Sequence, residues 1–151
     1  MKTVYLSLIF LFLIPFNVCT QTMSSPLRAH RWEHRIVLIF AQQADDQLVE
    51  EQIELRQAKS ADWAERDLFY FIFTPMGGQD QNGQEFSQAV AQEMYEHYGI
   101  AHDIFAVILI GKDGSEKLQK MNQVIPNELL FETIDAMPMR QREMREQEDP
   151  R

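Results

Sequence analysis

After residue 20, apolar residues gather in three continuous runs, and longer polar or mixed segments separate these runs. The runs are rich in β-branched and aromatic side chains, which is typical of strands buried on both faces of a sheet. They cover residues 35–40, 67–73 and 104–110. We therefore predict three buried strands at these positions.

Between and after these runs, the spacing of apolar residues becomes helical. The predicted helices cover residues 45–60, 85–98 and 126–137. Asp45 and Asp46 begin the first helix, at the end where the helix dipole favours acidic side chains. Gly99 ends the second as a residue that accepts a left-handed backbone, and Pro138 interrupts the third.

The remaining segments predict turns, one edge strand and a tail. Residues 76–84 contain three glycines together with Asp and Asn, which indicates a loop. Residues 111–114 form a turn because their Asp-Gly pair accepts positive φ, and residues 115–121 follow as an antiparallel edge strand. Residues 139–147 carry strong helix formers with little apolar surface, so they form either a short solvated helix or a frayed tail.

The order of elements is therefore β-α-β-α-β-β-α. Continuous apolar strands that are joined through helices indicate parallel pairs with both faces covered, and the turn at 111–114 adds one antiparallel strand. A mixed central sheet with helices on both sides in this order is the thioredoxin arrangement. We predict one α/β domain with a thioredoxin-like three-layer α/β/α fold.

Residues 1–20 have the pattern of a secretory signal peptide. Lys2 is the only charged residue before Arg28, and residues 4–16 form an almost unbroken apolar run. A run of that length is short for a bilayer span and typical of the h-region of a signal. We therefore divide the chain into a signal peptide (1–20), a polar leader (21–34), a thioredoxin-like domain (35–138) and a charged C-terminal helix or tail (139–151).

Cys19 is the single cysteine of the chain, and its place beside the predicted cleavage point decides which thiol chemistry is available. Cleavage after Thr20 removes it and leaves no disulfide, thiol nucleophile or thiolate metal ligand. Val18 and Phe16 fit a lipoprotein signal poorly. We expect an exported protein, periplasmic or extracellular, that meets a membrane only if Cys19 is lipidated.

Charge and composition exclude several classes of function. With 14 Lys and Arg against 23 Asp and Glu, the 151-residue chain has a formal net charge of −9. A duplex-binding protein needs cations to displace counterions from phosphate, so we expect no nucleic-acid partner. Hydrophobic residues make up 45% and charged residues 25% of the chain, which excludes a disordered chain and a disulfide scaffold.

Four short motifs resemble one family. They are Trp32-x-x-Arg35, Arg66-Asp67, residues 109–114 and the segment Ile134-Asp135-x-Met137-Pro138-Met139-Arg140-Gln141. Over about residues 27–144 the chain is similar to a domain of unknown function. That domain occurs alone in exported bacterial proteins and also in vertebrate secreted proteins of the sushi-repeat-containing and steroid-sensitive matrix type. The resemblance implies a thioredoxin-like fold close to the peroxiredoxins, and it supplies no established activity or catalytic residues.

A thioredoxin-fold enzyme places its cysteine just after the first strand, at a helix N-terminus that lowers the pKa of the thiol. Here residues 41–46 contain no sulfur, and Asp45 and Asp46 stand in its place. No proline precedes the third strand, where thioredoxins have a cis-proline. Both departures argue against thiol redox chemistry. Asp45 and Asp46 form either a helix cap, the simpler interpretation, or a paired-carboxylate acid–base site.

Two sets of histidines contain residue types that bind metals, but the predicted structure around them does not bring either set together as a metal site. His30, Glu33 and His34 have the i, i+3, i+4 spacing that converges on a metal when the segment is helical. They lie in a polar leader that enters a strand, where that spacing does not converge. Residues 97–103 hold a looser set. We predict no metal and no other cofactor, and we expect these histidines to be exposed or hydrogen-bonded.

Four charged residues at element ends are candidates for ligand binding. Arg66 and Asp67 precede the second strand, Lys112 lies in the hairpin turn, and Arg140 follows the bend at Pro138. They form either salt bridges that hold the strand ends and the last helix, or a recess that binds a carboxylate or an acidic segment of a partner.

Two functions therefore remain open. The first is an exported, cysteine-free, non-catalytic binding or interaction module, with an unknown protein or a small acidic ligand as its partner. The alternative is a non-thiol enzyme in a peroxiredoxin-like scaffold, with Asp45, Asp46 and Arg66 as candidate catalytic residues. A site that gathers these three residues favours the enzyme, whereas separated residues in capping and salt-bridge roles favour the binding module.

Overall fold

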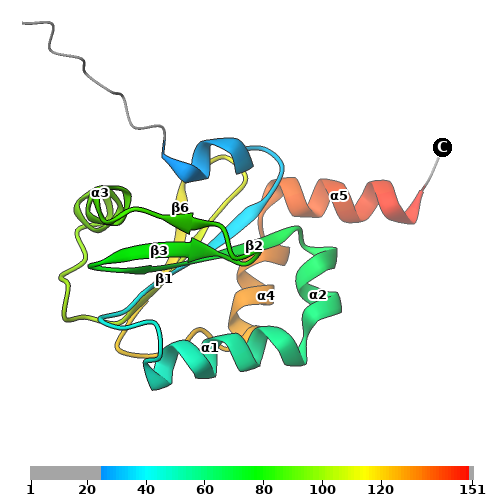
Figure 1. The fold of residues 1–151 in the computed structure, drawn as a ribbon. Coiled ribbons are helices and arrows are strands. Elements are labelled where there is room, and N and C mark those ends of the chain that lie inside the picture. The colour runs from blue at the N-terminus through cyan, green and yellow to red at the C-terminus, as the bar shows by residue number, and fades with distance from the viewer. Residues whose placement is uncertain (1–24, 150–151) are drawn as a thin grey trace, which may run out of the picture.

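Strand β1 (Arg35–Phe40) lies at the centre of the sheet, and all of its residues are buried. In the computed structural model, which describes residues 25–149, β1 pairs in parallel with β2 (Leu68–Thr74) and antiparallel with β5 (Ala106–Ile110). The outer strands are β3 (Gly77–Asp80), β4 (Glu85–Phe86) and β6 (Glu116–Met121). The order across the sheet is β4-β3-β2-β1-β5-β6 (Figure 1).

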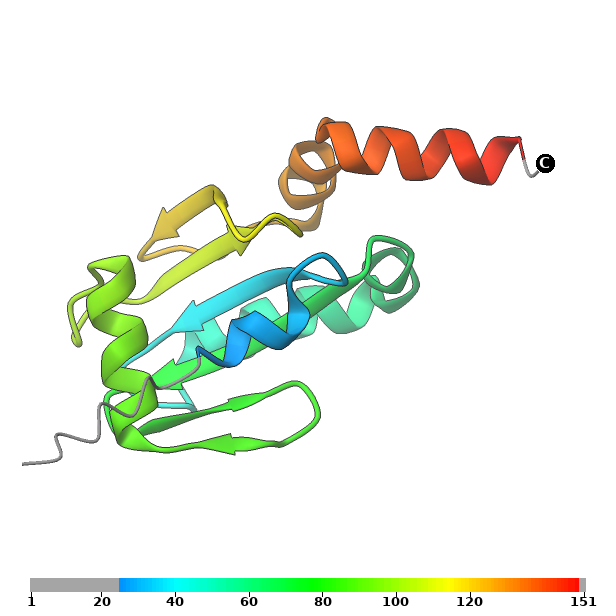
Figure 2. The same cartoon turned by 90° about the horizontal axis from the view of Figure 1, so that it is seen from above.

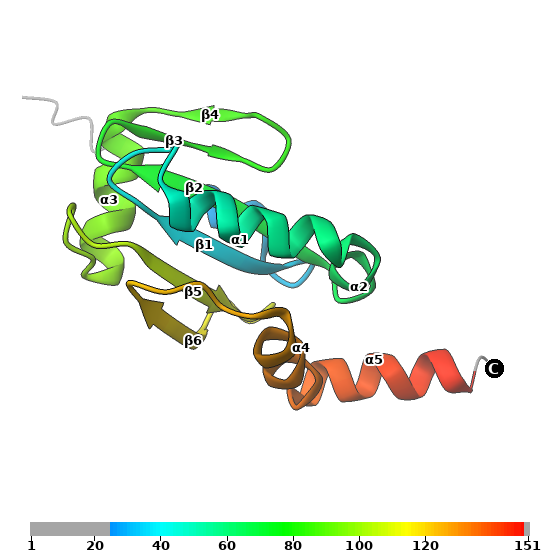
Figure 3. The same cartoon turned by 90° about the horizontal axis from the view of Figure 1, so that it is seen from below.

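Helices cover both faces of this sheet and form two separate cores. The elements on one face are α1 (Gln47–Ala58), α2 (Ser60–Glu65) and α4 (Asn127–Asp135), and those on the other are the 3-10 helix η1 (Pro26–His30) and α3 (Gln88–Tyr98) (Figures 2 and 3). Side chains of β1 alternate between the two cores, as Leu38 and Ile39 illustrate. The predicted three-layer α/β/α architecture is therefore confirmed.

The direction of the third buried strand differs from the prediction. Continuous apolar runs indicated parallel pairs, and β1 with β2 confirms this, but β5 runs antiparallel to β1. An apolar run reports burial on both faces and carries no information on strand direction. The direction is set by the connection, since the chain crosses through a hairpin and α3 before it enters β5.

The predicted loop at 76–84 contains β3, which pairs with β2 and with β4 in an antiparallel hairpin. Its glycines serve packing as well as turning. A Cβ at Gly78 would lie 2.5 Å from Phe73 Cδ1, so only glycine lets this strand approach the aromatic ring. The composition that indicated a loop reflects this close approach.

The helix bounds also differ in detail. The first predicted helix divides into α1 and α2 at Lys59, whose backbone leaves the helical region. The second begins at Gln88 and not at 85, because Ser87 Oγ caps it by accepting from Val90 N–H. The predicted turn at 111–114 is confirmed by the hydrogen bond from Gly114 N–H to Gly111 O, at 2.9 Å, and β6 follows it as an antiparallel edge strand.

The C-terminal segment forms helix α5 (Pro138–Glu148), with Pro138 in its first turn. This helix extends away from the sheet (Figures 2 and 3), so the solvated helix is the alternative that the structure supports. The predicted signal peptide and Cys19 lie outside the described residues. Within residues 25–149, no helix combines the length and the apolar character needed to cross a bilayer.

Tyr95 links α3 to the ends of the two parallel strands. Its hydroxyl donates to Ala41 O at 2.9 Å and lies 3.1 Å from Phe73 O. Burial raises the pKa of Tyr95 to about 12, and the hydrogen bond to Ala41 opposes this shift, so the donor stays protonated at physiological pH. The tyrosine thereby holds the segment that follows β1 against the sheet.

We predict that Tyr95→Phe lowers the free energy of unfolding by about 1–2 kcal/mol, because it leaves buried carbonyl groups without this donor. Urea unfolding measures the change. Tyr98→Phe is the matched control, since the Tyr98 hydroxyl makes no hydrogen bond with the described residues. Equal losses in both variants would contradict the role assigned to Tyr95.

Candidate functional site

The segment after β1 uses its polar groups for structure. Ala41 N–H donates to Phe73 O at 3.0 Å. Asp46 is the N-cap of α1, and its Oδ1 accepts from Leu48 N–H at 2.8 Å. Asp45 is exposed beside it. The structure thus places Asp46 in the capping role that was the simpler interpretation of this pair.

Arg66 lies at the other end of the sheet from Asp45 and Asp46. It immediately precedes β2, whereas the two aspartates follow β1, and the parallel register pairs Arg35 with Leu68 and Phe40 with Phe73. A strand of this length separates its ends by about 16 Å. The three candidate catalytic residues therefore do not converge on one site.

Arg66 instead belongs to an ion-pair cluster at the end of α4. Its Nε and Nη2 donate to the two oxygens of Asp135 at 3.0 and 2.7 Å, and its guanidinium lies 4.5 Å from the ring centroid of Phe131. Arg140, which is 1% exposed, donates to Asp135 Oδ1 at 3.3 Å and also pairs with Glu65. The two parallel hydrogen bonds between Arg66 and Asp135 fix the orientation of both side chains in addition to pairing their charges.

The two arginines shift the ionisation of their shared carboxylate. Burial raises the pKa of Asp135, but hydrogen bonds and charge from Arg66 and Arg140 outweigh burial and leave the pKa below its usual value. The hydrogen bond to Asp135 correspondingly raises the pKa of Arg66. Arg66 and Asp135 therefore stay ionised at neutral pH, and the cluster holds α4 and α5 against the start of β2.

A second group of charges surrounds Glu143 on α5. Its carboxylate accepts from Arg35 Nη2 at 3.1 and 3.2 Å and from Lys112 Nζ at 2.8 Å. Lys112 also pairs with Asp67 at 2.7 Å. Arg140 Nη1 lies 3.8 Å from the same carboxylate, which joins this group to the cluster around Asp135.

The structure therefore brings Arg66, Asp67, Lys112 and Arg140 into one network, where each is paired with a charged neighbour. Of these four, Lys112 alone is among the residues that line a cavity of about 250 Å³ beside the network. That recess has the following lining residues: Arg35, Gly111, Lys112, Asp113, Lys117, Met137, Pro138 and Met139. The geometry supports the salt-bridge alternative for Arg66, Asp67 and Arg140.

We predict that Arg140→Met lowers the free energy of unfolding by about 2 kcal/mol, because it removes charge-assisted hydrogen bonds from a buried site. Chemical denaturation measures the loss. Arg142→Met is the control, since Arg142 is exposed on the same helix. A folded Arg140 variant of unchanged stability would contradict the structural role assigned to Arg140.

His30 and His34 converge in the structure, contrary to the prediction for this segment. Their Nδ1 atoms are 3.2 Å apart, because residues 26–30 form a 3-10 helix and His34 N–H donates to His30 O in a helical turn. The His30 ring packs on Phe69, with centroids 4.3 Å apart. Within residues 25–149, no three His, Cys, Asp or Glu side chains gather as a group that could hold a metal ion.

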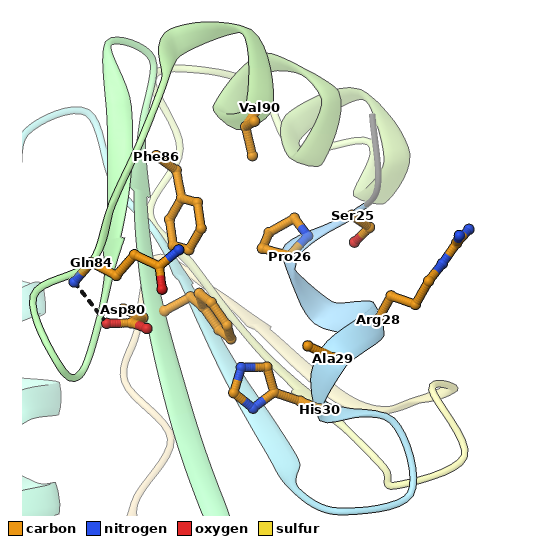
Figure 4. Close-up of a pocket in the computed structure, with 10 residues that line it drawn as sticks. Ser25, Pro26, Arg28, Ala29, His30, Asp80, Gln84, Phe86 and Val90 are labelled. Atoms are coloured by element: carbon orange, nitrogen blue, oxygen red, sulfur yellow. Dashed lines mark hydrogen bonds between the residues drawn. The ribbon is translucent and has the colours of Figure 1, made fainter. Parts of the chain in front are cut away.

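A cavity of about 530 Å³ lies between η1, the β3–β4 hairpin and α3 (Figure 4). Its lining residues are Ser25, Pro26, Arg28, Ala29, His30, Phe71, Asp80, Gln84, Phe86 and Val90. His30 and Asp80 supply polar groups on opposite elements. Burial lowers the pKa of His30, the charge of His34 lowers it further, and the charge of Asp80 opposes both effects. This cavity combines apolar walls with a few polar groups, as small-molecule sites do.

Comparison with known proteins identifies the family. Residues 26–143 match the model of a domain of unknown function (DUF4174). The chain belongs to the DUF4174 family. The resemblance inferred from the motifs is thereby confirmed for the domain of unknown function. The DUF4174 match includes η1, the first half of α5 and the cavity-lining residues of η1 and β3.

Among solved structures, this DUF4174 domain is similar to the reduced 2-Cys peroxiredoxin of Plasmodium vivax. The TM-score is 0.55 at 13% sequence identity, and the match covers 77% of this chain and 84% of that chain. A likeness at this identity establishes the fold alone. The predicted thioredoxin-like fold is confirmed.

The sequence analysis did not identify Asp80 as a candidate, and it rejected His30 as a metal ligand. Asp80 precedes an Asn-Gly pair, so its neighbours indicated a loop, and only the hairpin register places it on the sheet. The signal for His30 was its i, i+4 relation to His34 in a segment that begins with Ser25 and Pro26. Ser followed by Pro is a helix-start pattern, and it could have indicated the helical turn.

The lowered pKa of His30 predicts that acid destabilises the fold. A lowered pKa means that the folded chain binds this proton less readily than the unfolded chain, whose histidine pKa is 6.5. The contribution of neutral His30 to the free energy of unfolding is therefore fully present above pH 6.5. It is lost as the pH falls from 6.5 toward the lower pKa of the folded chain. Unfolding measured on both sides of pH 6.5 tests this, and His30→Gln should flatten that part of the profile. His97→Gln, on the exposed face of α3, is the control, and an unflattened His30→Gln profile would contradict the assignment.

Proposed function

We propose that this DUF4174 chain is an exported, non-catalytic binding module on a thioredoxin-like scaffold. One observation carries the proposal. Asp46 and Arg66 lie at opposite ends of the parallel strand pair, each engaged in a structural contact. Acid–base catalysis by these groups needs them within hydrogen-bond reach of one substrate, and their separation argues against it.

The segment at the usual catalytic position of the fold supports the same conclusion. Residues 41–46 contain no cysteine, and the dipole of α1 acts there on the capping carboxylate of Asp46. Ala41 is held by Tyr95 and Phe73 through both backbone groups. A thiol mechanism has no nucleophile at this position.

The binding role is supported by the cavity beside η1. At about 530 Å³, it lies within the size range of small-molecule sites. It lies on the face of the sheet opposite α1, so it does not use the usual catalytic position of the fold. The scaffold thus offers a binding site that is independent of thiol chemistry.

Export is supported by the sequence of residues 1–20, with its single cation and apolar run. Cleavage before Gln21 yields a protein without cysteine, and lipidation of Cys19 is the alternative that would anchor it to a membrane. Both routes lead outside the cytoplasm and leave the described domain available to an external ligand.

We predict that the full chain, expressed in an exporting host, is recovered with an intact mass that begins at Gln21. The same preparation should consume no hydrogen peroxide when dithiothreitol is supplied as reductant, because it holds no thiol. Intact mass spectrometry and a peroxide assay measure the two properties, with a 2-Cys peroxiredoxin as positive control.

A mass that corresponds to a chain beginning at an acylated Cys19 would support export and would show that the module is anchored to a membrane. An uncut chain would contradict export. Turnover of peroxide by a chain without cysteine would contradict the non-catalytic role.

A further inference from the structure

Asp80 is a buried carboxylate on the wall of the cavity beside η1. It is 7% exposed. Its Oδ1 accepts from Asn82 N–H at 2.8 Å and from Gln84 N–H at 3.0 Å, which fixes the carboxylate at the end of β3. Its Oδ2 has no hydrogen-bond donor among the residues that the structure describes. A buried carboxylate is costly unless a donor or a cation compensates it.

Arg28 and His30 line the same cavity, and neither forms an ion pair with Asp80 among the described residues. Arg28 lines the rim, but its side chain extends from η1 away from the cavity (Figure 4), and no ion pair joins it to Asp80 within residues 25–149. The low pKa of His30, caused by burial and by His34, favours a neutral ring at neutral pH. Within residues 25–149, the Oδ2 atom of Asp80 is therefore left available to accept a hydrogen bond from a ligand in the cavity.

The remaining walls of the cavity are apolar and partly aromatic. Phe71 lies on β2 and Phe86 on β4, with ring centroids 5.8 Å apart, and His30 adds a ring that lies edge-on to Phe71 at 5.4 Å. Val90 of α3 and Pro26 of η1 complete the apolar surface (Figure 4). Aromatic faces attract organic cations through their quadrupole.

We propose that this cavity binds a small organic cation, a primary ammonium group carried on an apolar body. The ammonium donates to Asp80 Oδ2, and the apolar body packs between Phe86, Val90 and Pro26. The net charge of −9 raises the local concentration of such cations. This inference rests on the proposed binding function and replaces the acidic ligand, predicted for the network at α5, by a cationic ligand at a different site.

The test uses 2-phenylethylamine as the probe and 2-phenylethanol as a neutral probe of the same shape. Isothermal titration calorimetry on the full-length protein at neutral pH should show the amine binding about tenfold more tightly than the alcohol, the difference that one charge-assisted hydrogen bond supplies. Equal affinity of the two probes, or no binding of the amine, would overturn the proposal.

Asp80→Asn is the decisive variant. It keeps an Oδ1 acceptor for Asn82 and Gln84 and removes the charge, so the hairpin is expected to fold. The amine should bind it about tenfold more weakly. Asp113→Asn is the matched control, because Asp113 Oδ1 likewise accepts from the N–H two residues ahead, Ser115, in a different turn, and its affinity for the amine should equal that of the wild type.

Analysis of the probe after incubation separates this proposal from the proposed function. An amine that binds through Asp80 and is recovered unchanged supports both. An amine that binds through Asp80 and is chemically converted supports the site and contradicts the non-catalytic role. An affinity lost equally in Asp80→Asn and Asp113→Asn would overturn the site, with circular dichroism of both variants confirming that they are folded.

Discussion

The burial of strand β1 on both faces is the constraint on which the rest of the structure depends. All of its residues are buried, so both faces need apolar cover and both edges need strand partners. Helices α1, α2 and α4 supply one cover, and η1 with α3 supplies the other. The same constraint buries Arg35 at the start of the strand, and a buried guanidinium requires a carboxylate partner.

That requirement explains how α5 is attached. The helix extends from the sheet and buries a single residue, Arg140, so apolar packing does not hold it. Glu143 compensates Arg35 and Lys112, while Arg140 reaches Glu65 and Asp135. The charged residues that the sequence offered as a possible binding recess thus join α5 to the ends of β1 and β2.

The similarity to a peroxiredoxin concerns the fold, whereas the chemistry of a protein depends on the side chains placed on that fold. The helix N-terminus that activates a thiol in thioredoxin-fold enzymes is capped here by Asp46. A cavity of about 530 Å³ lies instead between η1, the β3–β4 hairpin and α3. The hairpin and η1 therefore line a cavity on the face of the sheet opposite α1.

The buried strands, the two-sided cover, the turn at 111–114 and the absence of a thiol after β1 are predictable from the sequence, because they follow from local composition and period. Other features became known only from the fold: the direction of β5, the pairing of β3 and the partners of Arg66, Asp67, Lys112 and Arg140. The fold also places Asp80 and His30 on the walls of one cavity. These features join residues far apart in the chain, and a local pattern carries no information on which distant group completes a charge or a strand edge.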